Sequence, residues 1–150
     1  MKILVDADSC PKAARELILR TALRRKIHAV FAANRLIPGI CGENIVMDIC
    51  PDVENSADNR LAEIAETGDL AISRDLALAK RLLEKGAVVI DDRGRVFSRD
   101  SINELLSLRD FTVGLAKCGL GGERTANYGK KESKAFADAL DRQLVKLLKP

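Results

Sequence analysis

Two aspartates stand one residue apart near the start of the chain, in the stretch VDADSCP. Asp6 and Asp8 follow the apolar residues 3–5, where a buried strand is expected to end. One acid could cap the next helix, but like-charged carboxylates at one strand end repel each other, and a divalent cation relieves that repulsion. Mg²⁺ and Mn²⁺ prefer carboxylate oxygens and share phosphate oxygens with a substrate. The pair therefore predicts a metal site for phosphate-ester or phosphodiester chemistry.

Further acids occur at comparable places along the chain. Asp58 lies in the first turn of a predicted helix, Asp75 follows a predicted strand, and Asp91 and Asp92 follow another. Each has a structural alternative: Asp58 can complement a helix dipole, Asp75 can cap a helix, and the last two can form a tight turn before Gly94. We expect several of them to meet Asp6 and Asp8 at one edge of the sheet.

Two other polar residues are candidates for substrate binding. Asn34 follows a predicted strand, and Arg74, beside Asp75, can meet a phosphate. A turn-forming asparagine and a surface arginine are the alternatives. The single histidine, His28, opens a strand at the opposite end from the acids, which argues against histidine-based chemistry. The chain has no GxGxxG or GKS/T phosphate loop.

These residues need a scaffold, and the apolar pattern predicts an alternating one. Strands are expected at 3–5, 28–33, 44–49, 69–73 and 87–90, with a short edge strand at 95–98, and helices at 11–26, 57–66, 75–85, 101–116 and 131–148. The alternation predicts a three-layer α/β/α fold with a mainly parallel five-stranded sheet and strand 1 in its centre. Such sheets bind ligands beyond the carboxyl ends of their strands.

Composition places limits on the rest. The 150 residues, 47% of them hydrophobic, suit one domain spanning 1–150. No membrane-spanning run or secretory leader is recognisable, so we expect a cytoplasmic protein whose four cysteines are free thiols. Residues 117–150 carry eight Lys/Arg against four Asp/Glu, which makes the C-terminal helix basic and permits contact with a polyanion such as RNA. The glycine-rich stretch 118–130 is predicted to be a mobile loop.

Five motifs resemble the bacterial YaiI/YqxD family, in order and over almost the whole chain. They are VDADSCP at the N-terminus, SADN at 56–59, GDLAISRDLALA at 68–79, SLRDF at 107–111 and FADALDR at 136–142. That family is grouped with PIN-like and NYN nucleases, and the resemblance implies a PIN-like domain that holds Mg²⁺ or Mn²⁺ on acids and cuts RNA. Carried over by position, it implies Asp6, Asp8, Asp58 and Asp75 as both catalytic residues and metal ligands. Ser9 stands where the family commonly has alanine.

Three functions follow as alternatives. The first is a metal-dependent endoribonuclease that uses the four aspartates. The second is a haloacid-dehalogenase-like phosphatase, in which Asp6 attacks and Asp8 is the acid/base. In that alternative Ser73 binds phosphate, Lys80 or Lys85 is the lysine, and Asp91 and Asp92 are the late acids. The third is a non-catalytic metal- or RNA-binding protein.

Overall fold

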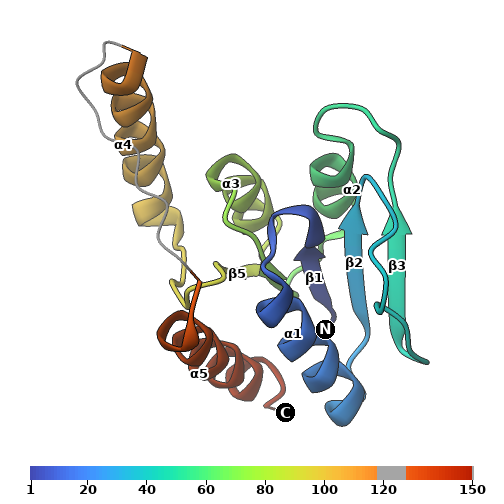
Figure 1. Ribbon diagram of the computed structural model, residues 1–150. Coiled ribbons are helices and arrows are strands. Elements are labelled where there is room, and N and C mark those ends of the chain that lie inside the picture. The colour runs from blue at the N-terminus through green and yellow to red at the C-terminus, as the bar shows by residue number, and fades with distance from the viewer. Residues whose placement is uncertain (118–127, 150) are drawn as a thin grey trace.

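The computed structural model describes residues 1–117 and 128–149, and only the backbone of 109–117. The strands are β1 (Ile3–Asp6), β2 (Ala29–Ala33), β3 (Ile45–Ile49), β4 (Leu70–Ile72) and β5 (Val88–Ile90). The helices are the 3₁₀ turn η1 (Ala7–Ser9), α1 (Lys12–Arg25), α2 (Ser56–Ile64), α3 (Leu76–Glu84), α4 (Arg99–Lys117) and α5 (Lys130–Leu147), as Figure 1 shows.

The five strands form one sheet in the order β3-β2-β1-β4-β5, and every neighbouring pair is parallel. The predicted parallel sheet with a central first strand is therefore confirmed. The expected edge strand at 95–98 is not a strand. It contributes one antiparallel bridge, between Ile90 and Val96, because the turn at Asp91–Gly94 brings the chain back along β5 for a single residue pair.

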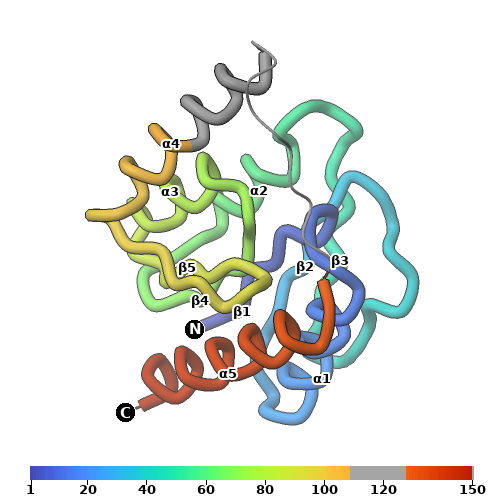
Figure 2. Tube along the Cα trace, turned by 60° about the vertical axis from the view of Figure 1, so that its left-hand side comes forward, coloured from blue at the N-terminus to red at the C-terminus, as the bar shows by residue number. Residues whose placement is uncertain are grey.

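Helices cover both faces of the sheet, so the predicted three-layer α/β/α architecture is confirmed. Alternate residues of β1 point to opposite faces: Ile3 and Val5 pack with α1 and α5, and Leu4 packs with α2, α3 and the start of α4. In Figure 2, α1 and α5 lie side by side on their face. Both cores are almost entirely aliphatic, as the scarcity of aromatic residues requires.

The connections reverse direction between β1 and β4, and this positions the site. The chain leaves β1 through α1 on one face and leaves β4 through α3 on the other face, although the two strands are neighbours. The loops after them separate, and in open parallel sheets such a switch point is where ligands bind. Asp6 ends β1, and the loop containing Arg74 and Asp75 follows β4.

Element ends differ from the predictions by a few residues. Helix α1 begins at Lys12 rather than at residue 11, with Pro11 at its N-cap position and no side-chain cap, and Ala7–Ser9 before it form a 3₁₀ turn. Helix α2 ends at Ile64, so Gly68, at φ +90°, belongs to the turn before β4 and does not close the helix. Most of the predicted loop at 118–130 lies outside the described residues. No helix in the described ranges has the length and apolar character to cross a membrane.

Candidate functional site

Four aspartates were predicted as the site, namely Asp6, Asp8, Asp58 and Asp75, and together they are called the acid group. Asp6 is the most buried of the four. The register pairs Val5 with Ile72, so the next residues, Asp6 and Ser73, are neighbours that point to the same face. Asp6 Oδ2 accepts hydrogen bonds from Ser73 Oγ at 3.1 Å and from Ser9 Oγ at 2.9 Å. Burial raises the pKa of this carboxyl group, the two serine bonds oppose that rise, and nearby Asp75 and Asp8 add to it. Among the described residues, the side-chain donors to this acid are therefore the two neutral serine hydroxyls.

Asp75 and Asp58 lie near Asp6 at the N-terminal ends of helices α3 and α2. Asp75 caps α3, because its Oδ1 accepts from Leu78 N at 3.1 Å, and its own N–H donates to Ser73 Oγ at 3.0 Å. Asp58, in the first turn of α2, has its pKa raised to about 6, first by burial and then by the charges of Asp6 and Asp75. The charge of Arg81 lowers that pKa, and a side-chain hydrogen bond with Asp75 adds a smaller rise. Asp75 thus fills its alternative role as a helix cap as well.

Asp8 stands at the rim of this group. Its Oδ2 accepts from Asn34 N at 2.8 Å, and its Oδ1 lies 3.7 Å from Arg35 Nε. The Asn34 side-chain amide donates to Pro51 O at 2.6 Å and to Ser56 Oγ. Asn34 therefore connects Asp8 to the loop before α2. Its side-chain amide nitrogen donates its hydrogen bonds to Pro51 and Ser56.

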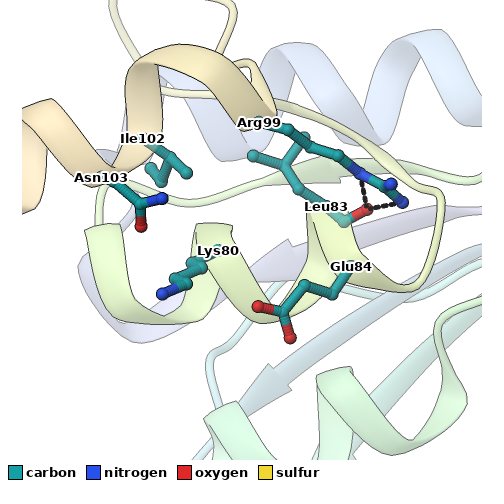
Figure 3. Close-up of a pocket in the computed structure, with 6 residues that line it drawn as sticks. All are labelled: Lys80, Leu83, Glu84, Arg99, Ile102 and Asn103. Carbon is teal, nitrogen blue, oxygen red and sulfur yellow. Dashed lines mark hydrogen bonds between the residues drawn. The ribbon is translucent and has the colours of Figure 1, made fainter.

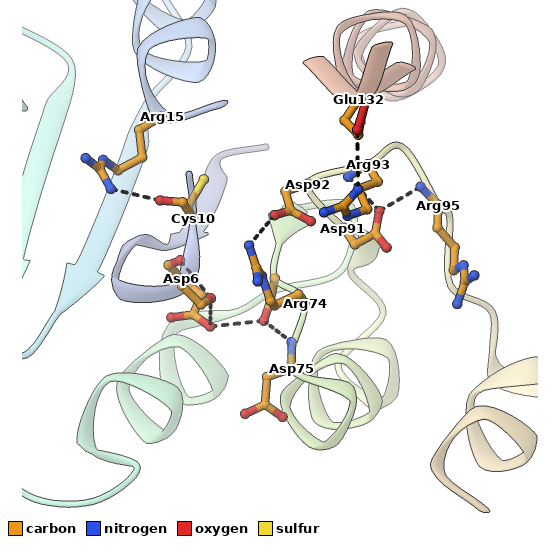
Figure 4. A network of polar contacts seen from close by, with 12 residues as sticks. Asp6, Cys10, Arg15, Arg74, Asp75, Asp91, Asp92, Arg93, Arg95 and Glu132 are labelled. Carbon is orange, nitrogen blue, oxygen red and sulfur yellow. Dashed lines mark hydrogen bonds and ion pairs between the residues drawn. The ribbon is translucent and has the colours of Figure 1, made fainter. Parts of the chain in front are cut away.

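Asp91 and Asp92 have opposite surroundings, although they are adjacent. Asp91 Oδ1 accepts from the backbone N–H groups of Arg93 and Arg95, both at 2.9 Å, which is the turn role expected of it. Asp92 is 4% exposed and binds Arg74 Nη2 at 2.6 Å (Figure 4). The sequence favours a turn role for Asp91 and Asp92 alike, because two acids before a glycine indicate a turn, and it does not predict the pairing of Asp92 with Arg74.

A narrow crevice joins Asp92 to the acid group. It is lined by Asp6, Ser9, Cys10, Ile72, Ser73, Arg74 and Asp92, and it is closed to a water-sized sphere. Burial, together with the charge of Asp92, raises the pKa of the Cys10 thiol to about 12, so this cysteine is neutral and a poor nucleophile. Cys10, Cys41 and Cys50 are free thiols, as predicted, and Cys118 lies outside the described residues.

Within the described residues, the ion pairs of the site involve Asp8 and Asp92 and not the other aspartates. Among the described residues, the ion pairs of the site join Arg35 to Asp8 and Arg74 to Asp92, and none reaches Asp6, Asp58 or Asp75. No three His, Cys, Asp or Glu side chains in residues 1–117 and 128–149 lie close enough to hold one metal ion together. The side chains gathered here offer carboxylate oxygens, which are the ligands that Mg²⁺ and Mn²⁺ prefer.

The lysines of the phosphatase alternative lie elsewhere. Lys80 lines a pocket between α3 and α4 with Ile102 and Asn103 (Figure 3). Lys85 caps the C-terminal end of α3, which is the edge of the sheet opposite to the acids. His28 also precedes its strand at that opposite edge, as expected from its position in the sequence.

Comparison with known proteins gives matches over nearly the full chain. Residues 4–146 match the model of the family described as "Uncharacterized BCR, YaiI/YqxD family". The UPF0178 protein of Treponema denticola is 46% identical over 149 residues, covering 99% of this chain and 95% of that protein. The UPF0178 proteins of Treponema pallidum and Syntrophobacter fumaroxidans are each 40% identical, over 99% of this chain and 84% and 97% of their own lengths. No solved structure matches.

Proposed function

The chain belongs to the YaiI/YqxD family, and from its acid group we propose that it is a divalent-metal-dependent ribonuclease of PIN-like type. One observation carries the proposal. Asp6, Asp58 and Asp75 converge from β1, α2 and the β4–α3 loop without an ion pair among the described residues, and their charges raise the pKa of Asp6 and of Asp58. Carboxylates brought together without a cation repel each other, and a bound divalent ion would relieve that repulsion.

Mg²⁺ or Mn²⁺ would be held by Asp58 and Asp75, with Asp6 and Asp8 as the remaining carboxylates of the set. Bound there, the ion supplies a Lewis acid for a phosphate oxygen and a more acidic water. The chain's own residues have separate tasks. Ser9 and Ser73 orient the Asp6 carboxylate, and Ser73 also fixes the backbone of Asp75.

RNA is the substrate class that the family resemblance suggests, and local charge is compatible with it. Arg35 and Arg74 stand at the rim of the site with side chains 72% and 52% exposed. Exposed arginines beside a metal site suit a phosphate backbone, since their guanidinium groups bind phosphate oxygens.

The phosphatase alternative has less support. Asp6 is 6% exposed, and the oxygen that accepts the serine bonds faces the closed crevice. A nucleophile must reach its substrate, and neither lysine of that alternative has a hydrogen bond or ion pair with Asp6 among the described residues.

The direct test is cleavage of a fluorescently labelled single-stranded RNA with 5 mM (on the order of cellular and assay levels) Mg²⁺ or Mn²⁺. We expect cleavage by the wild type, none in EDTA, and a loss of at least about 100-fold in Asp6→Asn and Asp75→Asn. Asp52→Asn is the matched control, because it removes an exposed acid outside the group. Equal rates in Asp6→Asn and wild type, or cleavage in EDTA, would contradict the proposal.

Crystals soaked in Mn²⁺ test the metal without any choice of substrate. An anomalous peak beside Asp58 and Asp75 is the expected result. RNA binding without cleavage would instead favour a binding protein, and a phosphoaspartate trapped on Asp6 would favour the phosphatase.

A further inference from the structure

Asp92 is a buried acid whose only side-chain partner within the described residues is Arg74. Its side chain is 6% exposed, and one oxygen lies 2.6 Å from Arg74 Nη2. A buried carboxylate is costly unless a cation compensates it, so the pair fixes the place of both groups. The cation of this pair, unlike its anion, reaches solvent.

Both the backbone and the side chain of Arg74 are fixed by neighbouring contacts. Its backbone lies between Ser73, which bonds Asp6, and Asp75, which caps α3 and bonds Ser73. Its guanidinium has one hydrogen bond in the described part of the chain, to Asp92, and about half of the side chain is exposed. An arginine has five N–H donors in a planar fork, so several remain to bind another anion.

The crevice places this fork beside the acids. Arg74, Asp92, Asp6 and Ser73 line the same crevice, and Figure 4 shows Arg74 between Asp92 and Asp75. A phosphate that contacts ions at the acids would therefore meet the Arg74 guanidinium at the mouth of the crevice. Unpaired, a long arginine side chain would sample many rotamers and lose this position.

We propose that Asp92 is a positioning residue: it holds the Arg74 guanidinium beside the acid group, where the arginine binds a phosphate of the RNA strand. This role rests on the proposed function. It adds a residue, Asp92, that neither touches the substrate nor holds the metal. The ion pair between Asp92 and Arg74 would contribute to substrate affinity.

The experiment compares Arg74→Ala, Asp92→Asn, the double variant and the matched control Arg95→Ala, which removes an exposed arginine from the neighbouring turn. Steady-state cleavage of single-stranded RNA is measured from 50 to 200 mM salt (roughly the range over which phosphate contacts weaken). We expect KM to rise about tenfold in Arg74→Ala and about threefold in Asp92→Asn, with kcat changed less than about twofold. The double variant should match Arg74→Ala, because Asp92 acts through Arg74.

The salt dependence separates positioning from folding. Loss of one phosphate contact should reduce the slope of log KM against log salt by about 0.7 in Arg74→Ala, whereas Arg95→Ala keeps the wild-type slope. If Asp92→Asn does not fold, the double variant replaces it, because the double variant buries no unpaired charge. KM and the salt slope are then measured on the double variant and compared with those of Arg74→Ala. An unchanged KM and slope in Arg74→Ala, or additive effects in the double variant, would overturn the inference while leaving the nuclease intact. A wild type that neither binds nor cuts RNA would overturn both.

Discussion

Two buried aspartates lie at opposite edges of the central strands and have opposite partners. Asp69, just before β4, is 2% exposed and accepts from Lys2 Nζ at 2.7 Å, Lys2 N at 3.1 Å and Glu66 N at 2.9 Å. Asp6, at the end of β1, is 6% exposed and accepts from two hydroxyl groups, with further acids nearby. Burial alone therefore does not distinguish a structural acid from a candidate functional one. The charge of the partners does.

The largest expected effect comes from removing the charge at Asp69. Asp69→Asn leaves the Lys2 ammonium, 18% exposed, without its buried counter-ion, and should lower the free energy of unfolding by about 3 kcal/mol. Urea denaturation with and without the substitution measures this. Cleavage per folded molecule should not change, and a stability equal to wild type would remove the distinction between the two edges.

A divalent cation should act on the Asp6 edge only. At about ten times its dissociation constant, Mg²⁺ or Mn²⁺ should stabilise the wild type by about 1.4 kcal/mol, because it binds the folded acid group and not the unfolded chain. Thermal unfolding across a metal titration is the measurement. Asp75→Asn should lose this gain and Asp52→Asn should keep it. An equal gain in Asp75→Asn would place the ion elsewhere.

The same substitution at Asp6 should have the opposite sign from that at Asp69. In EDTA, Asp6→Asn removes a buried charge that Asp75 and Asp8 disfavour, and it can keep an oxygen for the serine hydroxyls. We expect a gain of about 1 kcal/mol in the free energy of unfolding, together with loss of cleavage. A loss of stability similar to that of Asp69→Asn would mean that Asp6 is structural as well.

Proton uptake by Asp58 should appear as a pH dependence of stability. The folded protein holds this proton more tightly than the unfolded chain, since the pKa rises from 3.8 to about 6. Its contribution is therefore present below pH 3.8 and is lost as the pH rises through about 6. In EDTA, the unfolding temperature of the wild type relative to Asp58→Asn should fall by about 2 °C between pH 5 and pH 7.5. A difference that is constant with pH would contradict the raised pKa.

The smallest expected effect concerns the buried hydroxyl group of Tyr128. The Tyr128 hydroxyl has no hydrogen-bond partner in the described part of the chain, and burial raises its pKa to about 12. Tyr128→Phe should stabilise the protein by about 0.5 kcal/mol, measured by urea denaturation, because it removes an unsatisfied donor. Destabilisation would show that the hydroxyl has a partner in solution.

Much of the site was predictable because strand ends are readable. The apolar runs predicted the five strands of the sheet, and in a parallel sheet their carboxyl ends share one edge, so acids that follow strands, such as Asp6 and Asp75, were expected to lie near one another. Asp58 was a candidate from the first turn of a predicted helix. The same pattern predicted that Asp69 begins a strand and lies at the other edge. Asn34 was harder to predict, since its amide binds Pro51 and Ser56 from a loop without periodicity.

Asp91 and Asp92 show what the sequence by itself determined and what it did not, because the two adjacent acids have different partners. The apolar periodicity of the sequence determined the alternation of strands and helices and placed acids after strand ends, because this pattern is local. Its motifs indicated the family. Only the tertiary structure decided that Asp91 holds the turn while Asp92 enters the crevice and binds Arg74. The reason is that partner choice depends on which side chains meet across the sheet, and chain distances of 18 or 67 residues leave no local signal for it.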